Sequence, residues 1–258
     1  MKKTLIALAV AASAAVSGSA MAWDPSGTGG SVELGGTLTP QTKVTPWEIQ
    51  IGAAVTNLDG FVQKGQQNVV IPVGNAIPVL GIRNAASEGF DGEPSIKPQI
   101  DYKGSVDIDA FKNGVSTVRM EVRNNLGSKI GSLEAPFAAA AVSSWSGGGN
   151  SPGSKALYAS NDGFGFFGGL GKSAGAVRVV GSTEMIRGLS PDFVGKWKVQ
   201  GSWVDANGEK FDNVKARYYG AYGSGIEAGA KIQIKLDAPA AADAIAWKAS
   251  LPVTVSYQ

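Results

Sequence analysis

The side chains most often used for catalysis at neutral pH are missing from this 258-residue chain, which contains no histidine and no cysteine. Without them there is no imidazole general base, no thiolate nucleophile and no ordinary zinc or copper site. Carboxylate pairs could still support glycoside hydrolysis, but no spacing of Asp and Glu singles out such a pair. We therefore predict that the chain is not an enzyme, with no catalytic residues, no metal and no cofactor.

Two glycine-rich motifs resemble nucleotide-binding loops but lack the required context. Gly163, Gly165 and Gly168 have the dinucleotide spacing G-x-G-x-x-G, yet no buried strand precedes them and no helix pattern follows. Gly171-Lys172-Ser173 resembles the end of a phosphate-binding loop, but Phe166 stands where that motif needs its first glycine. Neither motif predicts a nucleotide site.

The first residues have the pattern of a secretory signal peptide. Two lysines precede an apolar run from Leu5 to Val16, and Ala20-Met21-Ala22 is a small-x-small cleavage site. We expect export and a mature chain that begins at Trp23. Loss of residues 1–22 removes two lysines and no acidic residue, which leaves equal numbers of basic and acidic residues. No net charge then directs the chain to nucleic acid, and none is predicted as a partner.

Alternation of apolar and polar side chains with period two recurs along the chain and predicts strands with one buried and one wet face. The apolar positions include Trp47, Ile49 and Ile51; Val69, Ile71 and Val73; Val118, Met120 and Val122; Trp197, Val199 and Trp203; Ile232, Ile234 and Leu236; and the odd positions from Trp247 to Tyr257. Turn signals such as Asn57 to Gly60 separate these runs, and short strands at this spacing indicate a sandwich or barrel. One short helix is expected, with Ser190 as N-cap and Pro191 as its first residue.

A short strand pattern follows a polar, glycine-rich stretch at the start of the expected mature chain. Residues 23–30 offer nothing that would anchor them to a core, which is typical of a flexible leader. In the next ten residues Val32, Leu34, Gly36 and Leu38 lie on one side of an extended strand. The pattern alone leaves open whether this strand folds into its own sheet or stays tethered and mobile.

Five segments together resemble the Fae-type (kappa-class) fimbrial subunits of the chaperone/usher class. They are residues 30–39, 47–52, 100–106, 222–229 and 247–258, and the absence of cysteine also fits this family. The resemblance implies an all-β, immunoglobulin-like sandwich of the pilin type that lacks one of its own strands. We accordingly expect a signal peptide at 1–22, an N-terminal extension with a donor strand at 23–40 and an incomplete pilin domain at 41–258. A glycine-rich insertion with loops and a short helix is expected at 138–189.

The resemblance also implies an assembly route and the residues that serve it. A periplasmic chaperone first supplies the missing strand, and at the outer-membrane usher the N-terminal extension of the next subunit replaces it by donor-strand exchange. The product is a self-polymer, a fimbrium on the cell surface. The donor residues would be Val32, Leu34, Gly36 and Leu38. The wall of the acceptor groove, which the chaperone also contacts, would be formed by Leu251, Val253, Val255 and Tyr257.

Adhesion to host glycoconjugates is a further implication, because the major subunit of Fae-type fimbriae binds them through an insertion. The segment Ala138 to Leu189 occupies the comparable place and offers aromatic side chains that could stack on sugar rings. These candidates, expected to be exposed, are Trp145, Tyr158, Phe164, Phe166 and Phe167.

Two other classes of protein share the strand pattern. One is an exported carbohydrate-binding β-sandwich with a complete set of strands, and the other is an outer-membrane β-barrel. The sequence leaves open whether the chain is a major or a minor subunit, and which receptor it would contact.

Overall fold

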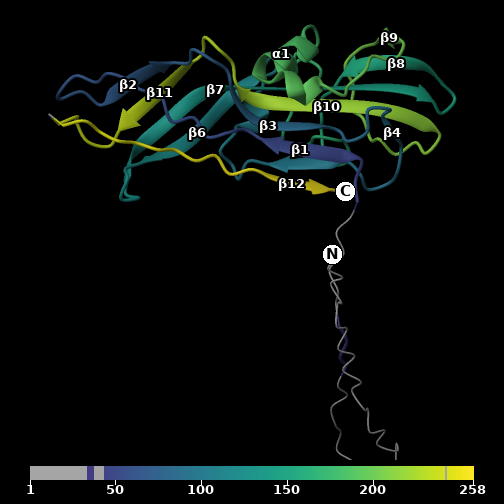
Figure 1. Cartoon of the computed structure of the whole chain (residues 1–258), viewed down its shortest axis with the longest axis horizontal. Coiled ribbons are helices and arrows are strands. Elements are labelled where there is room, and N and C mark those ends of the chain that lie inside the picture. Colours follow the sequence, from purple (N-terminus) through teal and green to yellow (C-terminus); the bar gives the residue numbers. More distant parts are fainter. Residues whose placement is uncertain (1–33, 38–43, 242) are drawn as a thin grey trace, which may run out of the picture. The chain divides into compact units, whose positions relative to one another are not determined.

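The computed structural model describes residues 34–37, 44–241 and 243–258, and the folded unit comprises Val44–Gln258. This unit consists mainly of strands (Figure 1). In chain order its elements are β1 (Trp47–Ile51), β2 (Asn68–Pro72), β3 (Ile77–Asn84), β4 (Phe90–Asp91), β5 (Pro98–Asp101), the 3-10 helix η1 (Ile108–Ala110), β6 (Val115–Arg123), β7 (Lys129–Gly147), β8 (Asn150–Ala156), α1 (Ser182–Leu189), the 3-10 helix η2 (Pro191–Val194), β9 (Ser202–Trp203), β10 (Ala216–Ile226), β11 (Lys231–Leu236) and β12 (Thr254–Tyr257).

Strand β7 organises the main sheet because it is 19 residues long. Its first half pairs with β6 and β11, and its second half pairs with β10 and β8. The resulting ten-stranded sheet has the central order β1-β3-β10-β7-β11-β2, while β12 and β5 form a separate pair. All of these pairings are antiparallel apart from β8 with β9. The predicted all-β sandwich is confirmed.

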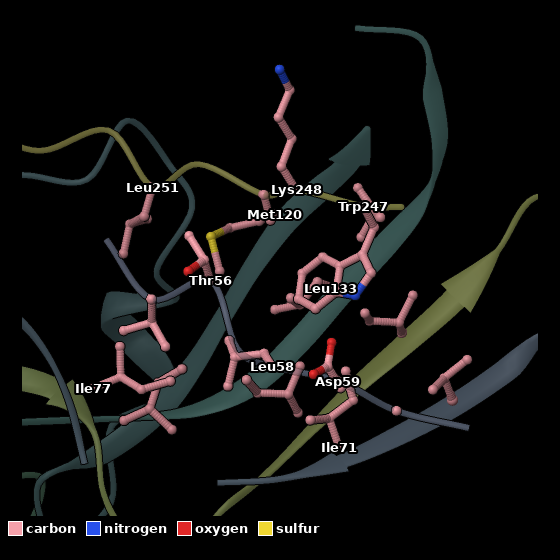
Figure 2. Close-up of a pocket in the computed structure, with 18 of the residues that line it drawn as sticks. Thr56, Leu58, Asp59, Ile71, Ile77, Met120, Leu133, Trp247, Lys248 and Leu251 are labelled. Carbon is pink, nitrogen blue, oxygen red and sulfur yellow. The ribbon is translucent and has the colours of Figure 1, made fainter. Parts of the chain in front are cut away.

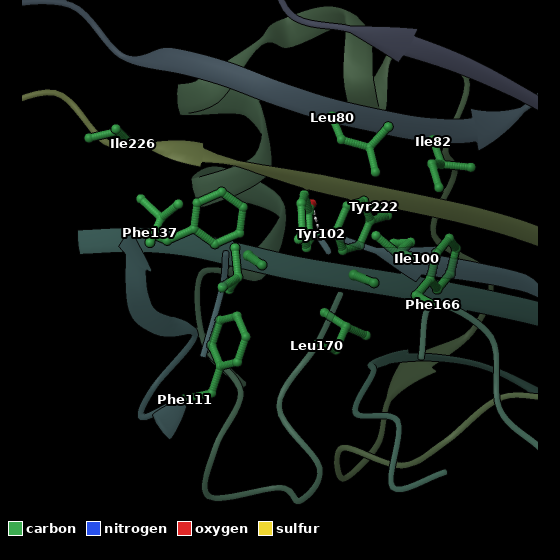
Figure 3. Packing of buried hydrophobic residues seen from close by; sticks show 14 of the residues in the cluster. Leu80, Ile82, Ile100, Tyr102, Phe111, Phe137, Phe166, Leu170, Tyr222 and Ile226 are labelled. Atoms are coloured by element: carbon green, nitrogen blue, oxygen red, sulfur yellow. Dashed lines mark hydrogen bonds between the residues drawn. The ribbon is translucent and has the colours of Figure 1, made fainter. Parts of the chain in front are cut away.

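The main core lies between the β3, β10 and β7 side of the sheet and the chain around β5 (Figure 3). The Tyr102 hydroxyl lies 2.9 Å from the Tyr222 hydroxyl and 2.7 Å from the Ser224 hydroxyl, and Tyr222 donates to the Gly169 carbonyl at 3.1 Å. Burial raises the pKa of Tyr102 to about 12 and also raises that of Tyr222. Because every hydroxyl in this buried network has a partner, the network fixes the β5 region against β10 without leaving an unsatisfied group.

The opposite face of β7 and β10 is covered by α1 and η2. Small side chains on the strands allow this close approach, since Ala138 and Ala140 of β7 belong to the same buried apolar cluster as Ile186 of α1. A Cβ atom built on Gly81 would lie 2.1 Å from the Phe193 ring of η2, so only glycine fits there.

Four local expectations differ from the structure. Residues 57–60 form no turn but continue an extended segment, and the turn falls at Lys64–Gly65. The 197–203 run is mostly loop, with Val199 and Trp203 about half exposed, and forms strand only at β9. On β1, Trp47 is buried as expected but Ile49 and Ile51 are exposed. In the segment 138–189, expected to be a glycine-rich insertion, residues 138–147 complete β7, and helix α1 was not expected. The short helix expected from Ser190 is confirmed as η2, which has Ser190 as N-cap and Pro191 as its first residue.

Candidate functional site

An elongated cleft of about 1000 Å³ opens between two extended segments of the folded unit. Its floor is formed by apolar side chains from five strands. They are Val69 and Ile71 of β2, Val118, Met120 and Val122 of β6, Leu133 and Phe137 of β7, Ile226 of β10, and Ile232, Ile234 and Leu236 of β11.

Most of the side chains that line the cleft are apolar. Its only charged lining residues, among the part of the chain that the structure describes, are Asp59, Asp243 and Lys248. Figure 2 shows the Lys248 side chain extending away from the apolar group that includes Met120 and Leu133. An apolar groove of this kind is typical of a site that a ligand or partner covers.

The first wall of the cleft is the segment 53–62, which follows β1. The Gly52 amide donates to the Val79 carbonyl at 2.9 Å, and the next backbone contact is the Gln63 carbonyl, which accepts from Gln66 at 2.9 Å. Between them, residues 53–62 make no backbone hydrogen bond to another described residue. Their burial is irregular, and Phe61 is fully exposed. This wall therefore presents unpaired amides and carbonyls without the regular alternation of a strand.

The second wall is the C-terminal segment, which is anchored at both ends. Lys248 and Arg123 exchange backbone hydrogen bonds of 2.9 Å, and Gln258 and Lys97 exchange bonds of 3.1 Å. In an antiparallel ladder every second residue exchanges hydrogen bonds with the neighbouring strand. Because Gln258 is bonded to Lys97, the backbone groups of residues 254, 256 and 258 point toward β5, and those of residues 255 and 257 point away from it. Residues 249–253 have no backbone partner among the described residues. The odd residues from 249 to 257 thus form one continuous open edge.

A second, smaller cleft of about 530 Å³ continues from the first. The two share residues 236, 241 and 244–246 in their linings. The far side of the smaller cleft is the hairpin between β6 and β7, where Leu126 is 92% exposed. The hairpin is held by Asn124, whose Oδ1 accepts from the amides of Leu126 and Ser128 at 3.0 Å each.

The described residues hold no group of three or more Asp and Glu side chains suited to a metal ion. None of the helices in the described ranges combines the length and apolarity needed to cross a membrane. The main chemical feature of the fold is therefore the apolar cleft with its two unpaired edges.

Comparisons with known proteins identify the family. A family model described as "Fimbrial, major and minor subunit" matches residues 1–258. The chain is 32% identical to K88 fimbrial protein AC of Escherichia coli over 290 aligned residues, which cover all of both chains. The chain belongs to this family of fimbrial subunits. It is also 32% identical to K88 fimbrial protein AB over 294 residues and 28% identical to the F41 fimbrial protein over 288 residues, both from E. coli and both with full coverage. The predicted family is confirmed, and the protein is a structural subunit of a cell-surface fimbrium.

Of the donor residues predicted for this fimbrial subunit, only Leu34 and Gly36 lie in the described part of the chain. Residues 34–37 form no strand, and the Leu34 side chain is 94% exposed. Val32 and Leu38 lie outside the described residues.

The predicted C-terminal residues divide between two environments. Leu251 and Val253 line the large cleft, whereas Val255 and Tyr257 belong to β12 and pair with Ile100 and Pro98 of β5. All four side chains are half-buried against the main core. They share one face of the segment, as the period-two pattern predicts.

The five aromatic side chains predicted in the 138–189 segment do not form one exposed patch. Phe166 is fully buried and stacks on Tyr222 with ring centroids 5.5 Å apart, which corrects the expectation that it is exposed. Trp145, Phe164 and Phe167 are half-buried against the core. Tyr158 is half-buried, and its hydroxyl donates to Asn207 Oδ1 at 3.1 Å.

The first wall, residues 53–62, was not predicted as part of a site. Its asparagine, aspartate and glycine are typical of turns, but Gly60 has another role. A Cβ atom there would lie 2.9 Å from Cγ1 of Ile71, so glycine allows the wall to pass close to β2. The available signal was the apolar content of the segment, with Val55, Leu58, Phe61 and Val62 within eight residues.

Proposed function

We propose that this fimbrial subunit polymerises by donor-strand exchange, in which residues 31–39 of one copy fill the large cleft of the next. The observation that carries the proposal is the apolar cleft flanked by two extended segments with unpaired backbone groups. An edge of this kind binds an extended peptide by β-augmentation, in which main-chain bonds give affinity and alternate side chains enter pockets.

The donor segment matches the chemistry of the cleft. Val32, Leu34 and Leu38 share one face, and full burial of three aliphatic side chains contributes roughly 5 to 9 kcal/mol. Gly36 on the same face suits a shallow point where two backbones approach closely. Leu34, at 94% exposure, is available to a neighbour.

Assembly in this proposal needs a periplasmic chaperone and an outer-membrane usher. The open cleft is an aggregation hazard for any subunit that leaves the inner membrane without a partner, since an unpaired strand edge pairs with other chains. The chaperone would cap the cleft and grip the open C-terminal edge, including Tyr257. Export through the periplasm follows from the expected signal peptide at residues 1–22.

The experiment is a deletion of residues 23–39 from the mature subunit, expressed with and without chaperone and usher. We expect the deletion variant to form a soluble chaperone complex and to form no fibres, because it keeps the acceptor cleft and loses the donor. Fibres from the deletion variant, or loss of the chaperone complex together with folding, would contradict the proposal.

We also propose that the assembled fimbria contacts a host glycan through the surface around Tyr158. Tyr158 lies at the surface with its hydroxyl held by Asn207 at 3.1 Å. The Lys155 Nζ donates to the carbonyl of the adjacent Gly208 at 2.9 Å and lies 5.0 Å from the ring centroid of Trp145 on β7. Aromatic rings that are held in place suit stacking on sugars. Phe166 takes no part, because it is buried.

Binding of purified fibres to immobilised glycans tests this second proposal. Tyr158→Ala is expected to reduce binding without affecting assembly. Trp203→Ala removes an aromatic ring that is 47% exposed and lies against the Trp197 ring, so it serves as the control for loss of an exposed aromatic ring. Equal loss from both variants, or no loss from Tyr158→Ala, would argue against a receptor contact at Tyr158.

A further inference from the structure

The smaller cleft beside the β6–β7 hairpin extends the proposed donor site, and its position gives it a specific occupant. It shares one wall, residues 244–246, with the large cleft. Any chain that leaves the large cleft at this end passes directly over it. The chain directions of the two walls determine which end of the donor strand leaves the large cleft beside the smaller one.

The two walls run in opposite directions, so a strand between them is antiparallel to one and parallel to the other. Residues 52 to 60 run from the Val79 end of the floor toward β2. The C-terminal wall starts beside the smaller cleft at residue 244, passes Arg123 at residue 248 and ends beside β5. The direction of the donor is therefore set by the wall that offers it the better antiparallel ladder.

The C-terminal wall is the better ladder partner. Its side chains alternate between half-buried and exposed at every position from 247 to 257, as in a regular strand. The wall 53–62 has no such alternation. Antiparallel pairing is slightly more stable per residue than parallel pairing. The donor strand therefore runs antiparallel to residues 249–257, and its C-terminal end lies at the smaller cleft.

We propose that the smaller cleft and the exposed hairpin tip form a docking seat for residues 39–44 of the neighbouring copy, the segment that follows its donor strand. This inference rests on the proposed donor-strand exchange. A strand advances about 3.3 Å per residue, so when residues 31–39 pair with 257–249, residues 39–44 continue along residues 249 to 244 and reach the smaller cleft beside the hairpin. Two exposed apolar side chains then meet at the joint. Leu126 of the acceptor is 92% exposed, and Val44 of the donor subunit is 90% exposed.

The hairpin is built to hold Leu126 in this position. Asn124 Oδ1 accepts from the Leu126 amide, and Arg123 Nη1 donates to the Gly127 carbonyl at 2.8 Å. A turn held by side-chain bonds presents an apolar side chain at small entropic cost. The seat therefore fixes the angle at which one subunit follows the next, in addition to the strand that joins them.

Cross-linking of assembled fibres tests the seat, and the absence of cysteine from the chain makes the test selective. The test variant is the full mature chain with Thr42→Cys and Leu126→Cys, assembled into fibres and treated with a short bismaleimide. The matched control is Thr28→Cys with Leu126→Cys. Thr28 lies four residues before Val32, as Thr42 lies four residues after Leu38, so the control reports the opposite strand direction. Repeating both pairs with Asn125→Cys in place of Leu126→Cys keeps the apolar tip intact.

We expect a ladder of cross-linked oligomers, stable to boiling in detergent, from the Thr42 pairs and none from the Thr28 pairs. A ladder from the Thr28 pairs alone would overturn the inferred strand direction and with it the seat. Fibres that form normally but give no ladder from any pair would overturn the seat while leaving donor-strand exchange intact. Failure of donor-strand exchange itself appears separately, as fibres that still form after deletion of residues 23–39.

Discussion

Truncation of a single donor side chain, Leu34→Ala, gives the most direct measure of how the cleft binds its donor. In the isolated subunit the Leu34 side chain is 94% exposed. Its truncation is therefore expected to change the free energy of unfolding of that subunit by less than about 0.5 kcal/mol, as for other surface substitutions. In the proposed filled cleft the same side chain is buried, so the substitution should weaken binding of the donor segment and leave the stability of the subunit nearly unchanged.

The magnitude follows from the atoms that are removed. Leucine exceeds alanine by about three methylene equivalents at about 0.8 kcal/mol each, or about 2.4 kcal/mol of lost transfer free energy. A residual cavity adds to this figure when the site is rigid. Because 1.4 kcal/mol corresponds to a factor of about ten, we expect the dissociation constant to rise by at least about 50-fold.

The assay is fluorescence polarisation of a labelled peptide of residues 28–42 titrated with the full-length subunit. Thr37→Ala is the matched control, since residue 37 lies on the opposite face of the strand from Leu34 and should point away from the cleft floor. We expect little change for Thr37→Ala. Equal weakening by both substitutions, or full affinity for the Leu34→Ala peptide, would refute the assignment of the inward face.

Four further predictions concern the acceptor subunit. Gly81→Ala would place a Cβ atom 2.1 Å from the Phe193 ring and should lower the free energy of unfolding in urea by about 1 to 3 kcal/mol. Gly188→Ala, whose Cβ meets nothing within 4 Å on helix α1, should raise it by about 0.5 to 1 kcal/mol. Burial raises the pKa of Tyr102 from 10.0 to about 12, so the native state binds the hydroxyl proton more tightly than the unfolded state does. The stability that this proton contributes is therefore lost as the pH rises from 10 to 12. The loss in wild type is on the order of 2 to 3 kcal/mol for this group, and Tyr102→Phe should flatten the pH dependence of chemical denaturation above pH 10. Leu251→Ser should weaken donor-peptide binding more than it lowers subunit stability, because Leu251 lines the cleft; the reverse order would contradict its place in the site.

The C-terminal wall could be predicted from the sequence because its alternation is simple. Every odd residue from Trp247 to Tyr257 is half-buried and every even residue is exposed. One face contacts the core and the other contacts water, which is the condition under which a period-two pattern reports structure. The strands β2, β6 and β11 were found for the same reason.

The opposite wall and the loops of the middle segment could not be found in this way. Residues 57–60 carry turn-forming side chains, yet they are extended, with Gly60 closely approaching Ile71. Phe166 lies in a glycine-rich stretch that suggests a surface loop, but it has a positive φ of 63° and its ring is directed into the core. The conformations at these positions depend on contacts between residues far apart in the chain, which the local order of apolar and polar residues does not reveal.

Helix α1 was missed because its own sequence supplies a weak start. Its N-cap is Gly181, which has left-handed backbone geometry and makes no side-chain cap bond. An eight-residue helix of this kind is marginal in isolation. Its stability comes from packing on the alanine-rich face of β7, where Ala138 and Ala140 share a buried cluster with Ile186. The short 3-10 helix beside it was predicted because Ser190 and Pro191 are strong local signals.

Pro252 shows why the open C-terminal edge can bind a strand despite a proline in its middle. Residues 254, 256 and 258 direct their backbone groups toward β5, and residue 252 is in phase with them. The Pro252 nitrogen, which has no hydrogen to donate, therefore points away from the large cleft. Residues 249, 251 and 253 keep their amides and carbonyls on the cleft side, where the described residues provide no partner. The proline thus removes no bond from the proposed donor ladder, and it prevents strand pairing on the opposite side of the same segment, where an added strand would compete with assembly.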